Sequence, residues 1–450
     1  MTNLIFSFDV EDYVNENAAE GILRVARMLR QNGIRGSFQT VGMMADALAE
    51  WGRQDILDKL GRYHEIGLHS HRHSMHPTIN EYTDLADFDA ALNACIEDEQ
   101  KAIGKLQDRF GISDPMPSAC PPGMSTSYVA HYAYAKLGFP IYTGDSLFDA
   151  RRNRPVWGCN IANLEYNYSF EKFLFTATED SMKQFLEEQV IPRDIYVLYH
   201  HPQRAYLCQY YDLENFLGEN KPKEAWVKTR VHTDEEIATF YKNLELLIQL
   251  IQNDPRIHVT TYGELAKTLN GARTLTRSML PDIKAQLDGY WFPVTTPDSF
   301  CLADVLHACA AFLRGEDTYP CGEVFGFLDT PYTAAKPVTL TALELREIAE
   351  RIRSDRFLPE YYLVGDKKIG PSDFLRAALA VLVDGAEQYT VLPDGAWQID
   401  LDQFPFLRDL SYKGTWCHCE SFEDRYLSHR FRLQSWTFRL PKGTERKIFE

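Results

Sequence analysis

Five of the chain's 13 histidines stand between His64 and His76. Histidine is the commonest transition-metal ligand, because its neutral imidazole nitrogen is available near neutral pH. His69 and His73 are four residues apart, so a single helical turn would aim both side chains at one point. A divalent ion held there needs a third ligand, usually a carboxylate, and an open position for water. The simpler alternative is an exposed polar turn that binds no metal.

Three acids close the first apolar run and offer that third ligand. Asp9, Glu11 and Asp12 follow an expected strand at residues 4–8. Side chains alternate along a strand, so Asp9 and Glu11 share a face, and Asp12 joins them only if the strand has already turned. One acid can hold the ion while another takes a proton from water. Whether Glu11 or Asp12 is the metal ligand stays open, and a solvated acidic loop is the alternative for the whole group.

Short apolar strands alternate with amphipathic helices through about the first 270 residues, which is typical of a parallel α/β sheet or barrel. Strands are expected at 4–8, 36–41, 64–68, 140–143, 195–199 and 257–260. A capping box at Thr233 to Glu236 predicts the start of a long helix, and a further helix is expected at 262–269. We therefore predict an α/β domain at 1–272 and a connection at 273–296.

The remaining residues, 297–450, predict a mainly helical accessory domain. The text Pro-x-[Asp/Ser]-Phe-x-x-Ala begins at Pro297 and again at Pro371, which suggests two repeated helical units. The tail after residue 388 is rich in aromatic and turn residues and is expected to form a mixed cap, with strands at 434–440. We expect packing, dimerisation or ligand positioning from this part, and a homo-oligomer could form through it.

Composition narrows the class of protein. The chain has 450 residues, of which 45% are hydrophobic and 25% charged, and its formal net charge is −17. A charge of this sign argues against general binding to nucleic acid or an anionic membrane. No leader and no membrane-spanning segment is visible in the sequence, and the nine cysteines are scattered, so a cytoplasmic protein with reduced thiols is expected.

Residues 3–270 resemble the polysaccharide deacetylase family of carbohydrate esterases. The family motif His-[Ser/Thr]-x-x-His-[Ser/Thr] is matched by His69 to Ser74, and the preceding strand is similar too. A variant of the family's first motif reads Asp-Val-Glu-Asp, which stands here at Asp9 to Asp12. The resemblance implies a distorted (β/α) barrel in which one acid, His69 and His73 bind metal. It also implies that Asp9 is the general base.

The segment from Ile195 to Pro202 resembles the family's last motif, an apolar strand that ends in Leu-x-His. That spacing selects His200 as the general acid, whereas family branches that read His-Pro select His201. Consecutive strand residues point to opposite faces, so we expect only one of the two to face the metal, and the other to pack behind the site.

Two departures from the family concern the substrate side. The third motif normally reads Arg-Pro-Pro-aromatic-Gly, with the arginine against the base, but the residues here are Ala119-Cys120-Pro121-Pro122-Gly123. A different group must then set the pKa of Asp9. For the fourth motif the chain offers only a segment that begins at Asp145. From the resemblance, Pro122, Gly123, Asp145 and Tyr199 are expected to contact the substrate.

These features together predict a metal-dependent hydrolase of carbon–nitrogen bonds that deacetylates N-acetylated sugars or glycans. Zinc is the expected ion, although cobalt, iron, manganese or nickel suits the same ligands. The alternatives are a hydrolase of cyclic amides or ureides and a non-catalytic glycan-binding protein. The C-terminal half is faintly similar to pseudomurein-binding repeats, around Phe357 to Leu375.

Overall fold

The chain divides into two compact units that are each discontinuous in sequence. The computed structural model describes residues 1–124, 127–144, 147–269, 271–289, 299–352, 356–393, 401–410 and 421–442. The first unit comprises Met1–Leu147, Asn163–Lys267 and Ser411–Arg425, and the second comprises Phe148–Ala162, Thr268–Leu410 and Tyr426–Glu450. Among the described residues, no helix combines the length and hydrophobicity needed to cross a membrane.

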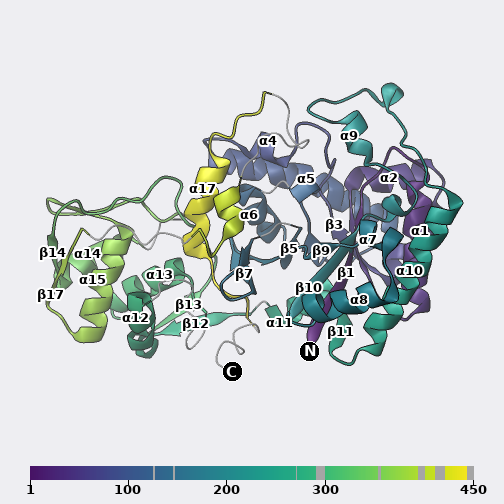
Figure 1. The fold of residues 1–450 in the computed structure, drawn as a ribbon. Helices are drawn as coiled ribbons and strands as arrows, with labels where there is room; N and C mark the ends of the chain where they lie inside the picture. Colours follow the sequence, from purple (N-terminus) through teal and green to yellow (C-terminus); the bar gives the residue numbers. More distant parts are fainter. Residues whose placement is uncertain are drawn as a thin grey trace. The chain divides into compact units, whose positions relative to one another are not determined.

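The first unit is built on parallel strands, and the predicted α/β architecture is confirmed (Figure 1). The strand order runs β5-β4-β3-β2-β1-β10-β9, and β11 pairs with the start of β1. The strands are β1 (Thr2–Val10), β2 (Ser37–Thr40), β3 (Glu65–Leu68), β4 (Ser118–Ala119), β5 (Ile141–Thr143), β9 (Tyr168–Ser169), β10 (Ile195–His200) and β11 (Ile257–Thr260). Strand β8 (Ile161–Leu164) spans the boundary between the units.

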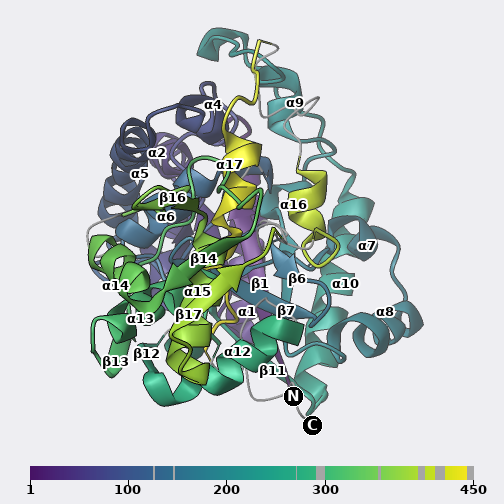
Figure 2. The same ribbon diagram turned by 90° about the vertical axis from the view of Figure 1, so that its left-hand side faces the viewer.

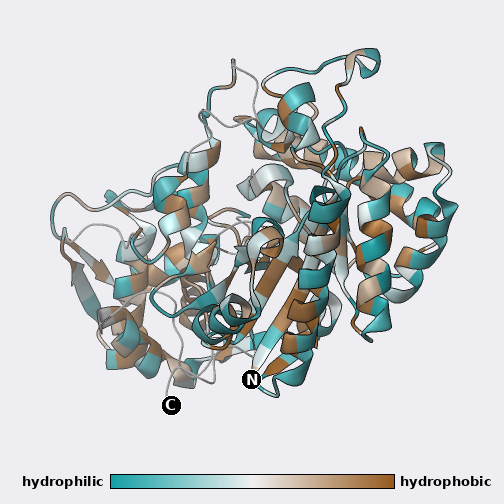
Figure 3. Cartoon of the chain, turned by 45° about the vertical axis from the view of Figure 1, so that its right-hand side comes forward, coloured by the Kyte–Doolittle hydropathy of each residue, from teal (hydrophilic) through white to brown (hydrophobic). Residues whose placement is uncertain are grey.

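Helices connect and cover these strands. They are α1 (Ala18–Gln31), α2 (Gly42–Glu50), α3 (Gln54–Tyr63), α4 (Ile79–Thr83), α5 (Phe88–Phe110), α6 (Tyr128–Lys136), α7 (Glu171–Thr176), α8 (Glu179–Phe185), α9 (Tyr211–Asn215), α10 (Asp234–Asn253) and α11 (Tyr262–Leu269). The capping box at Thr233 starts α10 as predicted. In Figure 3 the central strands are brown and most helices show one brown and one teal side, so apolar faces turn toward the sheet.

The sequence of β1 explains its central place. From Leu4 to Phe8 every side chain is fully buried, as expected for a parallel strand covered on both faces. Its neighbours β2 and β10 are parallel to it, so their carboxyl ends meet at one edge of the sheet. That edge is where α/β proteins place their chemistry.

The second unit contains the predicted helices, but three two-stranded antiparallel sheets accompany them in the part of the chain that the structure describes. Its elements are β6 (Phe148–Asp149), β7 (Arg154–Gly158), β12 (Arg273–Thr276), α12 (Leu280–Gly289), α13 (Leu302–Leu313), β13 (Thr318–Cys321), β14 (Val338–Thr341), α14 (Ala342–Arg351), β15 (Tyr362–Val364), β16 (Lys367–Ile369), α15 (Pro371–Asp384), β17 (Gln388–Val391), α16 (Pro405–Asp409) and α17 (Leu427–Leu433). Figure 2 shows β14 and β17 side by side near α15.

Two segments of this unit have the same plan, a strand, two helices and an antiparallel partner strand. They are β12-α12-α13-β13 and β14-α14-α15-β17, and the second also contains the β15-β16 hairpin. Asp304 and Asp373 both stand at the third position of their helices and accept a backbone N–H from the residue before the helix. The shared text at Pro297 and Pro371 predicts helices that begin 74 residues apart. That spacing is wrong for these helices, because Phe300 precedes α13 whereas Phe374 lies inside α15.

Two further expectations differ from the structure. Residues 273–289, expected as part of a connection, form β12, a short 3-10 helix and α12. The predicted strand at 434–440 is wrong, because Gln434–Thr437 is a 3-10 helix in which Thr437 donates a hydrogen bond to the Gln434 carbonyl at 2.7 Å. Only an isolated bridge between Trp157 and Arg439 has strand pairing there.

Candidate active site

Strand ends bring the predicted chemistry together in the first unit. Asp9 is the penultimate residue of β1 and Glu11 follows that strand directly. His69 follows β3, and His201 follows β10. Strands β1, β3 and β10 are parallel, and β2 lies between β1 and β3. The four side chains therefore gather at the carboxyl edge of the sheet.

Glu11 and the two predicted histidine ligands converge on one point. Oε2 of Glu11 lies 2.8 Å from Nε2 of His73 and 3.3 Å from Nε2 of His69. The other carboxylate oxygen, Oε1, accepts a hydrogen bond from Nε2 of Gln203 at 3.1 Å. Burial alone would raise the pKa of Glu11, but the charges of His73 and His201 lower it well below its usual range. One acid and two histidines form a set that a divalent ion can share.

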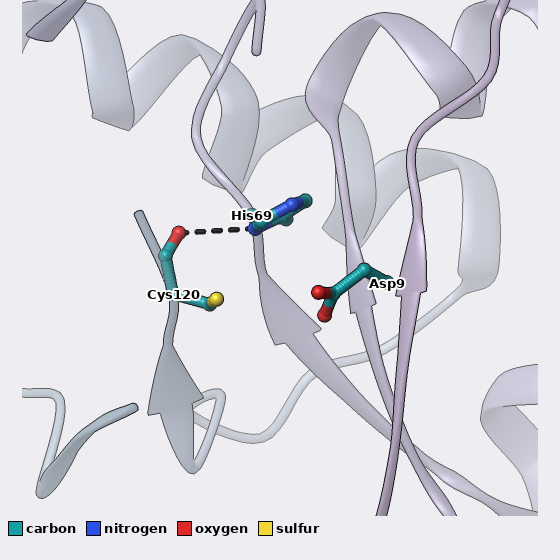
Figure 4. Close-up of side chains that lie close together, drawn as sticks. All are labelled: Asp9, His69 and Cys120. Carbon is teal, nitrogen blue, oxygen red and sulfur yellow. Dashed lines mark hydrogen bonds between the residues drawn. The ribbon is translucent and has the colours of Figure 1, made fainter. Parts of the chain in front are cut away.

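The hydrogen bonding of His69 shows which of its nitrogens can bind a metal. Nδ1 of His69 donates to the carbonyl oxygen of Cys120 at 3.2 Å (Figure 4). In the neutral ring the lone pair is therefore on Nε2, which faces the carboxylate of Glu11. Two lone-pair groups that face each other in a buried site fit a cation between them. The residues present thus suit the divalent ion that the sequence predicts.

The segment that carries His69 and His73 is a loop rather than the helical turn considered from the sequence. Ser70 and His73 both have positive φ, at 62° and 55°, which no helix permits. The Ser70 hydroxyl accepts the backbone N–H of His73 at 3.1 Å and so closes the loop. The centroids of the two imidazole rings still lie 4.9 Å apart, because the loop places both side chains on the same side.

Asp12 does not reach the metal cluster. Its Oδ1 accepts the backbone N–H groups of Val14 and Asn15 at 3.0 and 2.9 Å, and both oxygens accept from Nδ2 of Asn15. The carboxylate is therefore committed to the turn after β1. Of the two acids that the sequence left open, the structure brings Glu11 to the histidines.

His201 lies beside the acids and is held from behind. Its Nε2 is 3.6 Å from Oδ2 of Asp9 and 3.8 Å from Oε2 of Glu11. Its Nδ1 donates to Oε1 of Glu171, whose Oε2 accepts the hydroxyl of Tyr210 at 3.0 Å. Burial alone would lower the pKa of His201, but Glu171 and Glu11 raise it to about 10. Because Glu171 holds Nδ1, Nε2 is the ring nitrogen that faces the two acids.

His200, which the family spacing favours, is placed away from the cluster. It is fully buried, and its ring packs against Phe8, Phe170 and Phe240 at centroid distances of 6.2, 5.2 and 5.0 Å. Neither ring nitrogen has a hydrogen-bond partner among the described residues. Burial lowers the pKa of His200 to about 3. The alternation of strand side chains thus sends His200 into the core and leaves His201 at the edge.

Asp9 keeps a raised pKa although several positive groups surround it. Desolvation raises the pKa, and the charges of His69 and His201 only partly offset that effect. Oδ1 accepts the hydroxyl of Tyr166 at 2.7 Å. In Figure 4 the Asp9 carboxylate points toward the thiol of Cys120 and the ring of His69. A carboxylate with a raised pKa is suited to take up a proton.

A cavity of about 240 Å³ opens over this cluster. Its lining residues are Asp9, Glu11, His69, His73, Cys120, Pro121, Gly123, Gly144, Tyr166, Tyr199, His201, Tyr210, Asp212 and Leu213. Gly123 and Tyr199, two of the predicted substrate contacts, lie in this wall. Pro122 is not among the described lining residues, and Asp145 lies outside the residues that the structure describes.

Sequence reasoning missed the groups that support the cluster. Tyr166, Glu171 and Gln203 each contact an acid or a histidine of the site, and Asp212 lies 3.7 Å from Nδ1 of His73. None of them stands in a recognisable motif, and each comes from a segment far from its partner in the chain. Only the missing arginine of the third motif signalled that a substitute such as Tyr166 was needed.

No protein-family model matches the chain, and no curated protein matches it. Solved structures do show similarity. A Mycobacterium smegmatis protein provisionally described as a polysaccharide deacetylase is 15% identical, with a TM-score of 0.40, over 59% of this chain and 89% of its own. A family 4 acetyl xylan esterase from Clostridium thermocellum, in complex with a cobalt ion, is 12% identical, with a TM-score of 0.34, over 59% and 91%.

A family 4 carbohydrate esterase from Streptomyces lividans, in complex with acetate, is 12% identical, with a TM-score of 0.32, over 58% of this chain and 92% of its own. The similarity of the C-terminal half to pseudomurein-binding repeats is not supported by these comparisons.

Proposed function

We propose that this protein is a metal-dependent hydrolase of carbon–nitrogen bonds that removes acetyl groups from N-acetylated sugars. The observation that carries the proposal is the convergence of Glu11, His69 and His73 on one point, with Asp9 and His201 beside it. The sequence motifs of the chain support this substrate class, because they resemble those of the polysaccharide deacetylases.

Each side chain of the cluster has a role in the proposed reaction. Glu11, His69 and His73 would hold the ion, for which zinc is our first choice. When bound, a divalent ion supplies Lewis acidity that polarises the acetyl carbonyl and makes a water more acidic. Asp9 takes the proton of the attacking water, since desolvation makes its carboxylate a stronger base.

Breakdown of the tetrahedral adduct needs a proton for the leaving amine. His201 is placed to supply it from Nε2, because Glu171 holds the opposite nitrogen and keeps the ring protonated. The carbon–nitrogen bond breaks with its electron pair on nitrogen, and the products are acetate and the free amine. The backbone N–H of Gly123, in the cavity wall, is a candidate donor to the oxyanion.

The test is acetate release from N-acetylglucosamine oligomers by protein supplied with zinc or cobalt. We expect one free amine per acetate, and Asp9→Asn protein should release none above the blank. Metal-bearing, folded wild-type protein that releases no acetate would refute the proposal. Ring opening of a hydantoin-type ureide by the same preparation would instead favour the cyclic amide alternative.

A further inference from the structure

The two oxygens of the proposed base, Asp9, have different surroundings. Oδ1 accepts the hydroxyl of Tyr166 at 2.7 Å. Oδ2 lies 3.6 Å from Nε2 of His201, which is itself 3.8 Å from Oε2 of Glu11. A carboxylate that can rotate would exchange the two oxygens, so a fixed donor on one of them selects which oxygen meets the substrate.

Tyr166 is itself well fixed. Its ring stacks on that of Tyr199 with centroids 4.4 Å apart and planes 21° from parallel. Its hydroxyl also lies 3.2 Å from Oγ of Ser7, on the same strand as Asp9. The next residue, Asn167, bonds to the backbone of Val197 in both directions, at 2.6 and 3.1 Å. The segment that carries Tyr166 is therefore anchored to β10, and a donor with a locked ring can hold its acceptor in place.

A neutral donor also suits the chemistry of the base. Desolvation raises the pKa of Tyr166 well above 10, so the hydroxyl keeps its proton at any working pH. A tyrosine hydroxyl orients the carboxylate without adding a full positive charge against it. A cation in the same place would lower the basicity of Asp9 much more. The chain has no arginine in the third motif, where Cys120 stands.

We propose that Tyr166 is a positioning residue for Asp9: it holds Oδ1 so that Oδ2 faces His201 and receives the proton of the attacking water. This inference rests on the proposed function, because it assigns a role within the same reaction. Tyr166→Phe removes the hydroxyl but keeps the ring that stacks on Tyr199. The matched control is Tyr168→Phe, since Tyr168 lies two residues further on and packs against Phe185, outside the cavity.

The first experiment measures kcat and KM for acetate release from N-acetylglucosamine tetramer by zinc-supplied wild-type, Tyr166→Phe and Tyr168→Phe protein. Tyr166→Phe should lower kcat about tenfold to a hundredfold, the range for loss of one hydrogen bond to a charged group, with KM nearly unchanged. Because Asp9→Asn protein should release no acetate, the coupling is measured by a double-mutant cycle on the free energy of unfolding. In the Asp9→Asn background Tyr166→Phe should change this free energy less than it does in wild type, because its partner is already altered. Tyr168→Phe should retain wild-type kcat.

Three results would overturn the inference. They are additive losses in the free energy of unfolding from the Asp9 and Tyr166 changes, a rise in KM at constant kcat for Tyr166→Phe, and an equal fall in kcat for Tyr168→Phe. If wild-type protein releases no acetate, the proposed function fails, and with it the catalytic part of this inference. The unfolding cycle on wild type, Asp9→Asn, Tyr166→Phe and the double variant then still measures the contact itself. Coupling between positions 9 and 166 supports the positioning contact, and additive changes in stability refute it.

Discussion

His64 should make the first unit sensitive to acid, because it is buried as a neutral ring. It is 4% exposed and stands just before β3, the strand that leads to His69. Nδ1 accepts the backbone N–H of Gly36 at 3.1 Å, so Nε2 carries the proton and donates to the carbonyl of Ala26 at 3.0 Å. A second proton would remove the acceptor that Gly36 needs.

The size and direction of the effect follow from the pKa. Burial lowers the pKa of His64 from 6.5 to about 4. Between these values the unfolded chain binds a proton that the folded chain does not, so the stabilisation is complete above pH 6.5 and is lost as the pH falls toward 4. At about 1.36 kcal/mol per pKa unit, the loss in the free energy of unfolding is about 3 kcal/mol.

The assay is denaturant unfolding of wild-type and His64→Gln protein at a series of pH values from 7 to 4, followed by circular dichroism. A glutamine can accept from Gly36 and donate to Ala26 without titrating, so it isolates the histidine from all other acid-sensitive groups. Wild type should lose about 3 kcal/mol more than His64→Gln over this range. His258→Gln, at an exposed position of β11, is the control and should follow wild type. Parallel curves for wild type and His64→Gln would refute the reasoning.

Three further predictions concern the site and its supporting strands. Asp12→Ala should keep full metal content but lower the free energy of unfolding by about 1–2 kcal/mol, because two backbone N–H groups lose their acceptor. Loss of metal in this variant would contradict the placement of Asp12 outside the metal cluster. Gly67→Ala should lower the free energy of unfolding by about 1–3 kcal/mol, since its new Cβ would lie 2.0 Å from Oε1 of Gln39. Denaturant unfolding measures this loss, and an unchanged midpoint would contradict it. His201→Gln should lower turnover about 10²–10⁴-fold. His200→Leu should change the free energy of unfolding and leave turnover near that of wild type. The opposite pattern would assign the role of general acid to His200.

Much of the site could be predicted because it depends on local sequence. A histidine pair after a short apolar strand, and acids after another, identify strand ends, and parallel strands bring those ends together. Strand periodicity also placed Asp9 and Glu11 on one face. It could not exclude Asp12, because the turn that uses Asp12 depends on hydrogen bonds to Val14 and Asn15 that no periodic pattern shows.

The rest depends on contacts between distant segments. The choice between His200 and His201 depends on where β10 ends and on the apolar rings that enclose His200, which come from three other segments of the chain. Glu171 and Tyr166 reach the site from segments with no motif of their own. In the second unit, β12 was missed because a four-residue edge strand carries little signal without its partner, β13.

The central claim is that Glu11, His69 and His73 hold one divalent ion, and elemental analysis of purified protein tests it most directly. Wild-type protein and the His64→Gln control should each contain one ion per chain after dialysis against zinc and then metal-free buffer. His69→Ala and His73→Ala protein, folded as judged by circular dichroism, should contain almost none, because each loses one of three ligands. Equal metal content in all four proteins would contradict the account.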